Sequence, residues 1–327
     1  VRVATGEVRE LAKGVWTSLS WAGGRIAGLR TGARTPTAVT TVDPATGEKQ
    51  VLATGPGPGL AAVAEAMPEP ELVSWEAPDG AEVHGRLWRL PTAGAATPPP
   101  LLVWAHGGPT DQRRVTFDPR LVFFLSRGWA VLHPDCRGTT GWGRAWAQAL
   151  RGEWGGADVD DVLAGARAAV ERGWGDPRRL VAMGGSAGGM TALLLLARDP
   201  GLWAAAVALY PVTDLEALSA STHRFEAHYN LGLVGPLPEA AHRYRKRSPI
   251  HLAGRITAPV LLLHGADDVV VPPDQSRQLA AALRGRGVPV EHHEYEGEGH
   301  GWRSPATVQD ELERTAAFLE RHAPLRR

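Results

Sequence analysis

The stretch LVAMGGSAGGM, at positions 180–190, decides the fold of this chain. Its first four residues are apolar without alternation, a pattern that favours a strand covered on both faces. A G-x-S-x-G frame follows, with Gly184 and Gly188 on either side of Ser186. Residues 187–198, which include a run of leucines, favour a helix. A strand, a sharp turn and a helix in this order predict a nucleophile elbow, which lifts the serine hydroxyl above a sheet.

The serine motif alone is weak evidence, because 39 of the 327 residues are glycine. By composition alone, such a frame is expected in roughly one chain in seven, so the motif needs its structural context. A glycine-rich strand-to-helix turn without catalytic function is the alternative interpretation. A nucleophile also needs a base, an acid that orients the base, and an oxyanion hole, and the rest of the chain must supply them.

The overall composition excludes several classes of partner. The formal net charge is +0, which argues against nucleic acid or an anionic membrane as the main partner. Cys136 is the only cysteine, so no intrachain disulfide forms, and we expect a reducing, cytoplasmic location. Neither a membrane-spanning apolar run nor a signal peptide is found in the sequence.

Residues 1–68 differ in pattern from the rest. The segment TGEVRELAKG at 5–14 recurs as TGEKQVLATG at 46–55, a spacing of about 41 residues, which is typical of a β-propeller blade. Each Thr-Gly-Glu indicates a hairpin turn, and two similar hairpins in a small β-domain are the alternative. A ring needs at least about four blades, so we expect this chain to be the C-terminal part of a longer protein, with 1–68 as the propeller remnant.

Residues 69–327 are predicted to form an α/β domain. Pro68-Glu69-Pro70 marks its start, and a hairpin around Asp79-Gly80 comes first. Strands and helices then alternate, which predicts a mostly parallel, doubly wound sheet with helices on both faces. The predicted strands are 101–105, 130–133, 180–183, 204–209, 260–264 and 288–295. The predicted helices are 119–127, 159–171, 187–198, 273–284 and 305–322.

The missing catalytic parts are expected in loops at the carboxyl ends of these strands. In an α/β-hydrolase the acid and then the histidine follow the serine in the chain. His300 follows the last predicted strand, between Gly299 and Gly301, and is the predicted base. Asp267 and Asp268 follow the strand 260–264, and position alone does not choose between them as the acid.

The oxyanion hole needs two backbone N–H donors. One is expected from Ala187, the residue after the nucleophile. The other is expected from the loop after the strand 101–105, which reads His106-Gly107-Gly108-Pro109. Because proline has no N–H, the donor is Gly107 or Gly108, and we interpret His106 as a structural residue of this loop.

With these motifs in place, residues 69–327 resemble the catalytic domain of the prolyl oligopeptidase family, nearest its acylaminoacyl-peptidase and dipeptidyl-peptidase group. The resemblance rests on HGGP at 106–109, DCRGTTGWG at 135–143, WGG at 154–156, GGSAGG at 184–189, HGADD at 264–268 and EGHG at 298–301. In that family the acid stands four places after the histidine of the His-Gly segment, which implies Asp268. The second glycine of the HGGP loop donates to the oxyanion, which implies Gly108.

The resemblance has further implications. Members of the family carry a β-propeller ahead of the hydrolase, in agreement with the repeat in 1–68. The segment after the strand 204–209 lines the substrate pocket in that family, which implies Tyr210, Val212 and Leu215 here. The family position of Tyr210 is more often small, so this pocket is expected to be altered. The Arg137 loop is either structural or substrate-binding, and we favour the structural interpretation.

The sequence therefore predicts a serine peptidase that hydrolyses short or acylated peptides through an acyl-enzyme, with the triad Ser186, Asp268 and His300. No cofactor or metal is expected, because the zinc-peptidase, phosphate-loop and dinucleotide motifs are absent from the sequence. A carboxylesterase on the same fold is the first alternative, and a non-catalytic interaction module is the second. The sequence leaves homo-oligomerisation and the residue preference at the scissile bond open.

Overall fold

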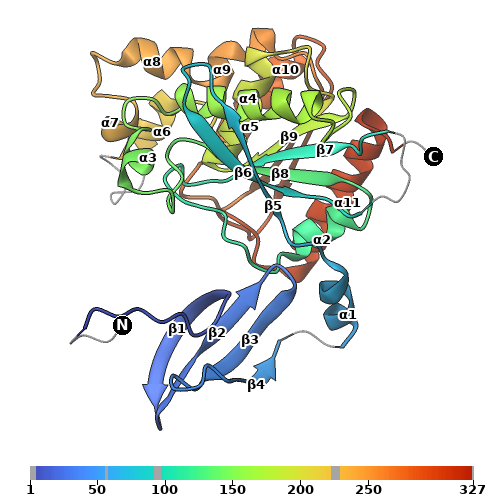
Figure 1. Cartoon of the computed structure of the whole chain (residues 1–327). Coiled ribbons are helices and arrows are strands. Elements are labelled where there is room, and N and C mark those ends of the chain that lie inside the picture. Colours follow the sequence, from blue (N-terminus) through green and yellow to red (C-terminus); the bar gives the residue numbers. More distant parts are fainter. Residues whose placement is uncertain (1–4, 56–57, 92–96, 222–228, 326–327) are drawn as a thin grey trace. The chain divides into compact units, whose positions relative to one another are not determined.

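The computed structural model describes residues 5–55, 58–91, 97–221 and 229–325. Contacts between Cα atoms divide the chain into two units (Figure 1). The first consists of Val1–Pro70 with Arg114–Val122, and the second of Glu71–Arg113 with Phe123–Arg327. The short segment Arg114–Val122 was not expected to group with the N-terminal unit, because it lies far from that unit in the sequence.

The first unit is an antiparallel sheet in which each strand pairs with the next, in the order β1-β2-β3-β4. Its elements are β1 Val15–Ala22, β2 Arg25–Gly32, β3 Thr35–Val42, β4 Lys49–Thr54 and α1 Pro58–Ala66. The hairpin predicted at the second Thr-Gly-Glu is confirmed, since Gly47 has φ +78° and its N–H donates to the Asp43 carbonyl at 2.7 Å. The first Thr-Gly-Glu forms a turn as well, but the residues before it lie outside the described chain.

Large apolar side chains remain exposed on this sheet. Leu19 and Trp21 of β1 are 62% and 64% exposed, and Val51 and Leu52 of β4 are each 55% exposed. The unit therefore does not bury the apolar side chains of its two outer strands within itself.

The second unit contains an eight-stranded sheet in the order β12-β11-β10-β9-β7-β8-β6-β5. Its strands are β5 Glu71–Glu76, β6 Glu82–Trp88, β7 Leu101–Ala105, β8 Ala130–Asp135, β9 Leu180–Gly185, β10 Ala205–Leu209, β11 Val260–Gly265 and β12 Val290–Tyr295. Strands β7 to β12 pair in parallel, whereas β5 and β6 form an antiparallel edge that joins the rest through β8. The predicted α/β-hydrolase fold with a preceding all-β segment is confirmed.

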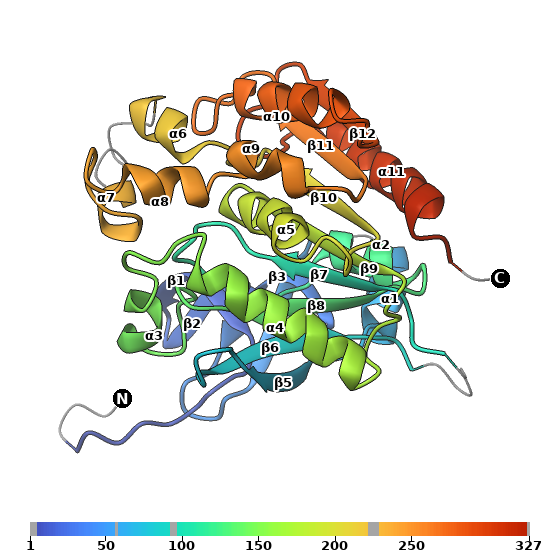
Figure 2. The same cartoon turned by 90° about the horizontal axis from the view of Figure 1, so that it is seen from above.

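Helices cover both faces of the sheet: α4, α5 and α10 lie on one face and α11 on the other (Figures 1 and 2). Their bounds are α4 Ala157–Glu171, α5 Ala187–Arg198, α10 Asp274–Arg284 and α11 Pro305–His322. Helix α5 packs on β7, β9 and β10, and every residue from 187 to 197 is buried. This burial on all sides explains why the helix has no polar face.

The shorter helices are α2 Pro119–Leu125, α3 Arg144–Gln148, α6 Leu215–Ser221, α7 Tyr229–Leu233, α8 Ala241–Lys246 and α9 Pro249–Leu252, with the 3₁₀ turn η1 Ala253–Arg255. The elements from α6 to η1 form the connection between β10 and β11, and the sequence analysis predicted none of them. None of these elements is longer than about two helical turns. A helix this short shows too few apolar repeats to be predicted from the sequence pattern. No helix in the described part of the chain is long and apolar enough to cross a membrane.

The glycines of the motif are required where α5 begins. A Cβ on Gly188 would lie 2.5 Å from the carbonyl oxygen of Ala105 and 2.6 Å from that of His106. A Cβ on Gly184 would be driven into the carbonyl oxygen of Gly188. Helix α5 therefore packs on the ends of β7 and β9 at a backbone distance that only glycine permits.

We predict that Gly188→Ala destabilises the protein by more than about 2 kcal/mol, because a carbonyl oxygen has no room to move away from the added methyl group. In an unobstructed helix the same substitution stabilises by about 1 kcal/mol. The matched control is Gly232→Ala in α7, where a Cβ meets nothing within 4 Å. Urea unfolding measures both variants, and equal stabilities would show that the close approach is not a constraint.

Candidate active site

Ser186 lies in the turn between β9 and α5 with φ 56° and ψ −123°. This conformation is strained for a residue with a side chain, at a cost of about 1–3 kcal/mol. The surroundings hold the turn, since the Ser186 N–H donates to the Leu209 carbonyl at 2.9 Å and the Met190 N–H donates to the Ser186 carbonyl at 3.1 Å. The predicted nucleophile therefore has the backbone geometry of an elbow.

The structure brings Ser186, Asp268 and His300 together in one line. His300 Nε2 lies 2.9 Å from Ser186 Oγ, across 114 residues of sequence, and His300 Nδ1 lies 2.7 Å from Asp268 Oδ2. An ionised carboxylate only accepts hydrogen bonds, so Nδ1 carries the proton of the neutral ring and Nε2 accepts from the serine hydroxyl. This is the protonation pattern that a general base requires.

Burial distinguishes the two candidate acids. Asp268 is buried and accepts a hydrogen bond from His300, whereas Asp267 is exposed. Asp268 Oδ1 accepts from the backbone N–H groups of Val270 and Val271, each at 2.9 Å. Although burial opposes ionisation, hydrogen bonds from His264 and His300 hold the pKa of Asp268 well below its usual range. Asp268 is thus a carboxylate at neutral pH.

His264 is a supporting residue that the sequence analysis did not single out. Its ring is fully buried, with Nε2 2.8 Å from the Val271 carbonyl and 3.4 Å from Asp268 Oδ2. Since a carbonyl only accepts, Nε2 carries the proton, and Nδ1 accepts from Ser276 Oγ at 2.7 Å. His264 therefore holds the loop that carries Asp268. The signal for it was present, because His264 is the first residue of the HGADD motif.

Glu298 is a second supporting residue. It lies two places before His300, is buried, and accepts from the N–H groups of Arg303 and Ser304 at 2.8 and 2.9 Å. Its carboxylate thus closes the loop onto the start of α11 and satisfies backbone donors there. Ser304 is the N-cap residue of α11, but its side chain makes no capping hydrogen bond.

The HGGP loop lies against the elbow. A Cβ on Gly107 would lie 3.6 Å from Ser186 Cβ, and Gly108 has φ +126°, a conformation that favours glycine. His106 Nδ1 lies 2.6 Å from the Gly107 carbonyl and Nε2 lies 2.8 Å from Thr139 Oγ1, so both ring nitrogens are engaged within the protein. Burial lowers the pKa of His106, which favours its neutral form. The structural interpretation of His106 agrees with these contacts.

The model of the prolyl oligopeptidase family matches residues 115–325 of this chain. The chain belongs to the prolyl oligopeptidase family. The match takes in the segments that carry Ser186, Asp268 and His300, and the expectation drawn from those motifs is confirmed at the level of the family.

Individual relatives agree with this assignment. Over 257 residues the chain is 30% identical to dipeptidyl peptidase family member 6 of Caenorhabditis elegans, covering 77% of this chain and 34% of that protein. Over 236 residues it is 30% identical to the acylamino-acid-releasing enzyme of Arabidopsis thaliana, and the match covers 69% of this chain and 30% of that protein. The structure of a puromycin-hydrolyzing peptidase from Mycobacterium tuberculosis is 36% identical, with a TM-score of 0.87, and the match covers 95% of this chain and 48% of that one. The chain thus spans about a third of the curated relatives and about half of the solved chain.

The three residues predicted to line the substrate pocket of this prolyl oligopeptidase family chain lie in different environments. Val212 and Leu215 are buried and belong to the hydrophobic core of the second unit. Tyr210 is partly buried and its ring lies beside that of His300. The substrate-lining role of all three stays a prediction.

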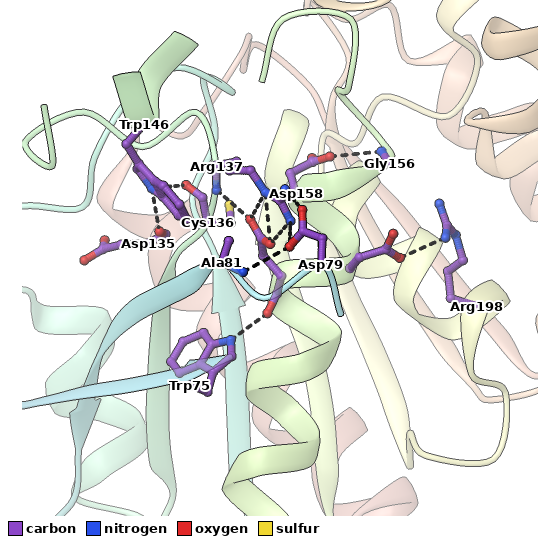
Figure 3. A network of polar contacts seen from close by, with 12 residues as sticks. Trp75, Asp79, Ala81, Asp135, Cys136, Arg137, Trp146, Gly156, Asp158 and Arg198 are labelled. Atoms are coloured by element: carbon purple, nitrogen blue, oxygen red, sulfur yellow. Dashed lines mark hydrogen bonds and ion pairs between the residues drawn. The ribbon is translucent and has the colours of Figure 1, made fainter. Parts of the chain in front are cut away.

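Arg137, in the family's Arg-Gly loop, is held by two carboxylates (Figure 3). Its N–H groups donate to Asp161 of α4 from the backbone at 2.8 Å and from the side chain at 2.5–3.1 Å, and a further nitrogen pairs with Asp79 in the β5–β6 turn. The Trp75 indole donates to the Asp161 carbonyl at 2.8 Å. Arg137 thus joins the loop after β8 to α4 and to the β5–β6 turn, in agreement with the structural interpretation of its loop.

A buried acid lies next to this network. Asp158, in the first turn of α4, is buried and accepts from the Gly156 N–H at 3.0 Å (Figure 3). Burial and the nearby Asp161 carboxylate raise the pKa of Asp158 to about 7. The folded protein therefore binds a proton at Asp158 that the unfolded chain releases near pH 4.

We predict that Asp158→Asn removes part of the pH dependence of stability. Folding raises the pKa of Asp158, so its protonation stabilises the folded state. This contribution to the free energy of unfolding is fully present below pH 4 and is lost as the pH rises toward 7, at about 1 kcal/mol per pH unit. Asn keeps an acceptor for Gly156 and has no such slope. Urea unfolding at pH 5 and 8 compares the variant with wild type. Asp160→Asn is the control, because Asp160 is a partly exposed carboxylate that pairs with Arg198. The same change in unfolding free energy between pH 5 and 8 in all three proteins would contradict the prediction.

Proposed function

We propose that this chain carries the catalytic domain of a serine peptidase that hydrolyses short or acylated peptides through an acyl-enzyme intermediate. The observation that carries the proposal is the line of hydrogen bonds from Ser186 through His300 to a buried carboxylate, with distances of 2.9 and 2.7 Å. An interaction module that binds without catalysis has no need of this alignment or of the strain at Ser186.

In the proposed first step, Ser186 Oγ attacks the scissile carbonyl carbon while its proton passes to His300 Nε2. Asp268 accepts the hydrogen bond from Nδ1, and its negative charge stabilises the imidazolium that forms. His300 then gives the proton to the leaving amine as the C–N bond breaks. Water, deprotonated by His300, attacks the ester carbonyl, and Ser186 regains its proton as the acid product departs.

The negative charge on the tetrahedral oxygen is proposed to be held by the N–H groups of Ala187 and Gly108. Ala187 is the first residue of α5, so its N–H points out of the helix N-terminus, where the helix dipole also favours an anion. Gly108 is chosen over Gly107 because of the family resemblance. Removal of one such donor costs about 3–4 kcal/mol of transition-state stabilisation in enzymes of this kind.

We further propose that residues 1–68 are the last part of a β-propeller. The sequential antiparallel order β1-β2-β3-β4 is that of a propeller blade, and the exposed apolar side chains of β1 and β4 suit packing against neighbouring blades. As the family resemblance implies, we expect a complete propeller to restrict substrates to short peptides. The puromycin-hydrolyzing relative makes puromycin, an aminoacyl amide, a reasonable test substrate beside peptides.

The nucleophile is tested with a fluorophosphonate probe. We expect the wild-type chain to be labelled and Ser186→Ala to remain unlabelled, because the probe bonds only to an activated serine. An unlabelled wild type, or full labelling of Ser186→Ala, would contradict the assignment of Ser186 as the nucleophile. Turnover of peptidyl anilides against aliphatic esters then separates a peptidase from a carboxylesterase, and turnover of esters alone rejects the peptidase.

The acid is tested by a pair of neighbouring substitutions. Asp268→Asn is expected to lower kcat by about 10⁴-fold, because an amide in place of the carboxylate favours the wrong tautomer of the histidine. Asp267→Asn changes an exposed carboxylate one residue away and is expected to retain wild-type kcat. Steady-state kinetics measures both, and a comparable loss in the two variants would contradict the assignment of Asp268.

A further inference from the structure

Tyr210 has an unusual conformation at a central position of the sheet. It follows β10 with φ 37°, in the left-handed region that residues with bulky side chains rarely adopt. Its N–H donates to the Leu263 carbonyl at 2.6 Å, while the carbonyl of the preceding Leu209 accepts from Ser186. The chain at Tyr210 is thus tied to the strand that leads to Asp268 and to the turn that carries Ser186.

The side chain of Tyr210 contacts the base. Its ring centroid lies 4.7 Å from that of His300 with an interplanar angle of 59°, and 5.2 Å from that of Trp302 in an edge-on arrangement. A Cβ added to Gly301, the residue between them, would lie 4.0 Å from the Tyr210 hydroxyl. The ring therefore packs on the side chains of His300 and Trp302, two residues of the same loop.

The same ring contacts the strand that carries the nucleophile. A Cβ on Gly185 would lie 3.1–3.2 Å from ring carbons and the hydroxyl of Tyr210. Because Gly185 has no side chain, the Tyr210 ring can pack against the backbone one residue before Ser186. This explains a glycine that the G-x-S-x-G frame itself does not require.

We propose that Tyr210 is a positioning residue, which sets the separation between Ser186 and His300. The inference rests on the proposed function of these two residues. Strands β9 and β12 are not neighbours, since β10 and β11 lie between them. A loop histidine after β12 must therefore reach across two strands to the serine after β9. Tyr210, at the end of β10, occupies the space between them and touches both sides.

A flat aromatic ring suits this role for a physical reason. The ring of Tyr210 is bounded by the backbone at Gly185 and by the rings of His300 and Trp302, so a rigid plate of fixed thickness fills this space. A small side chain would leave a cavity beside His300 and let the imidazole turn away from Ser186. Strain of the kind seen at Tyr210 persists only where the surroundings hold the residue in place.

This role differs measurably from lining the substrate pocket. A pocket residue affects KM, or kcat/KM, in a way that depends on the substrate's side chain. A positioning residue lowers kcat by a similar factor for every substrate, because misplacing a base by about 1 Å costs on the order of 10²-fold whatever is bound. It also slows labelling of Ser186 by a small fluorophosphonate that reaches no side-chain pocket.

The test compares Tyr210→Ala, Tyr210→Leu and Tyr210→Phe with wild type, on three peptidyl anilides that differ in the residue before the scissile bond. We expect Tyr210→Ala and Tyr210→Leu to lower kcat and the labelling rate by about 10–10²-fold, with KM within about threefold. Tyr210→Phe keeps the ring and is expected to retain kcat within about threefold of wild type. Circular dichroism and thermal unfolding establish that each variant is folded, and Tyr210→Leu serves alone if Tyr210→Ala is not.

Three outcomes overturn the inference: wild-type kcat in Tyr210→Leu, a change in KM that follows the size of the substrate side chain, or a loss in Tyr210→Phe as large as in Tyr210→Leu. Failure of the proposed function gives a different result, in which the wild type itself neither turns over substrate nor reacts with the fluorophosphonate. A labelled wild type with an equally labelled Tyr210→Leu rejects the positioning role alone.

Discussion

The close approach of backbone to backbone at the start of α5 is the constraint on which the site depends. Gly188 packs on the carbonyls of Ala105 and His106 at a distance that excludes any side chain. This contact places the HGGP loop beside Ser186 and directs the N-terminus of α5, with the Ala187 N–H, toward the same point. The positions of the proposed nucleophile and of its proposed anion-binding donors thus follow from one packing contact between β7, β9 and α5.

The proposed base His300 and the proposed acid Asp268 depend on a second set of contacts at the same sheet edge. Asp268 is fixed by two backbone N–H groups and by the ring of His264, and Glu298 fastens the His300 loop to α11. Because β9 and β12 are separated by two strands, the hydrogen bond between Ser186 and His300 forms only if each loop is held separately. Tyr210, at the end of β10, contacts both His300 and the residue before Ser186.

Much of this arrangement could be predicted because it depends on local pattern. Unbroken apolar runs marked the buried strands β7 and β9, the order serine, aspartate, histidine matched the order of the loops, and glycines marked turns that need them. The short helices between β10 and β11 were missed, since their periodicity is too brief. Asp267 and Asp268 could not be separated by position, because both follow the same strand. The family resemblance implied Asp268, and its burial and its hydrogen bond with His300 agree with that choice.

By itself, the sequence determined the strands and longer helices of the second unit, their alternation and the side chains at the carboxyl ends of the strands. These properties are encoded in neighbouring residues, through apolar periodicity and the conformational freedom of glycine. Only the tertiary structure decided that Asp268 is buried against His300, that Arg137 pairs with Asp79 and Asp161, and that Tyr210 packs on His300. Such relations join residues tens of positions apart, so they are set by how strands and helices pack.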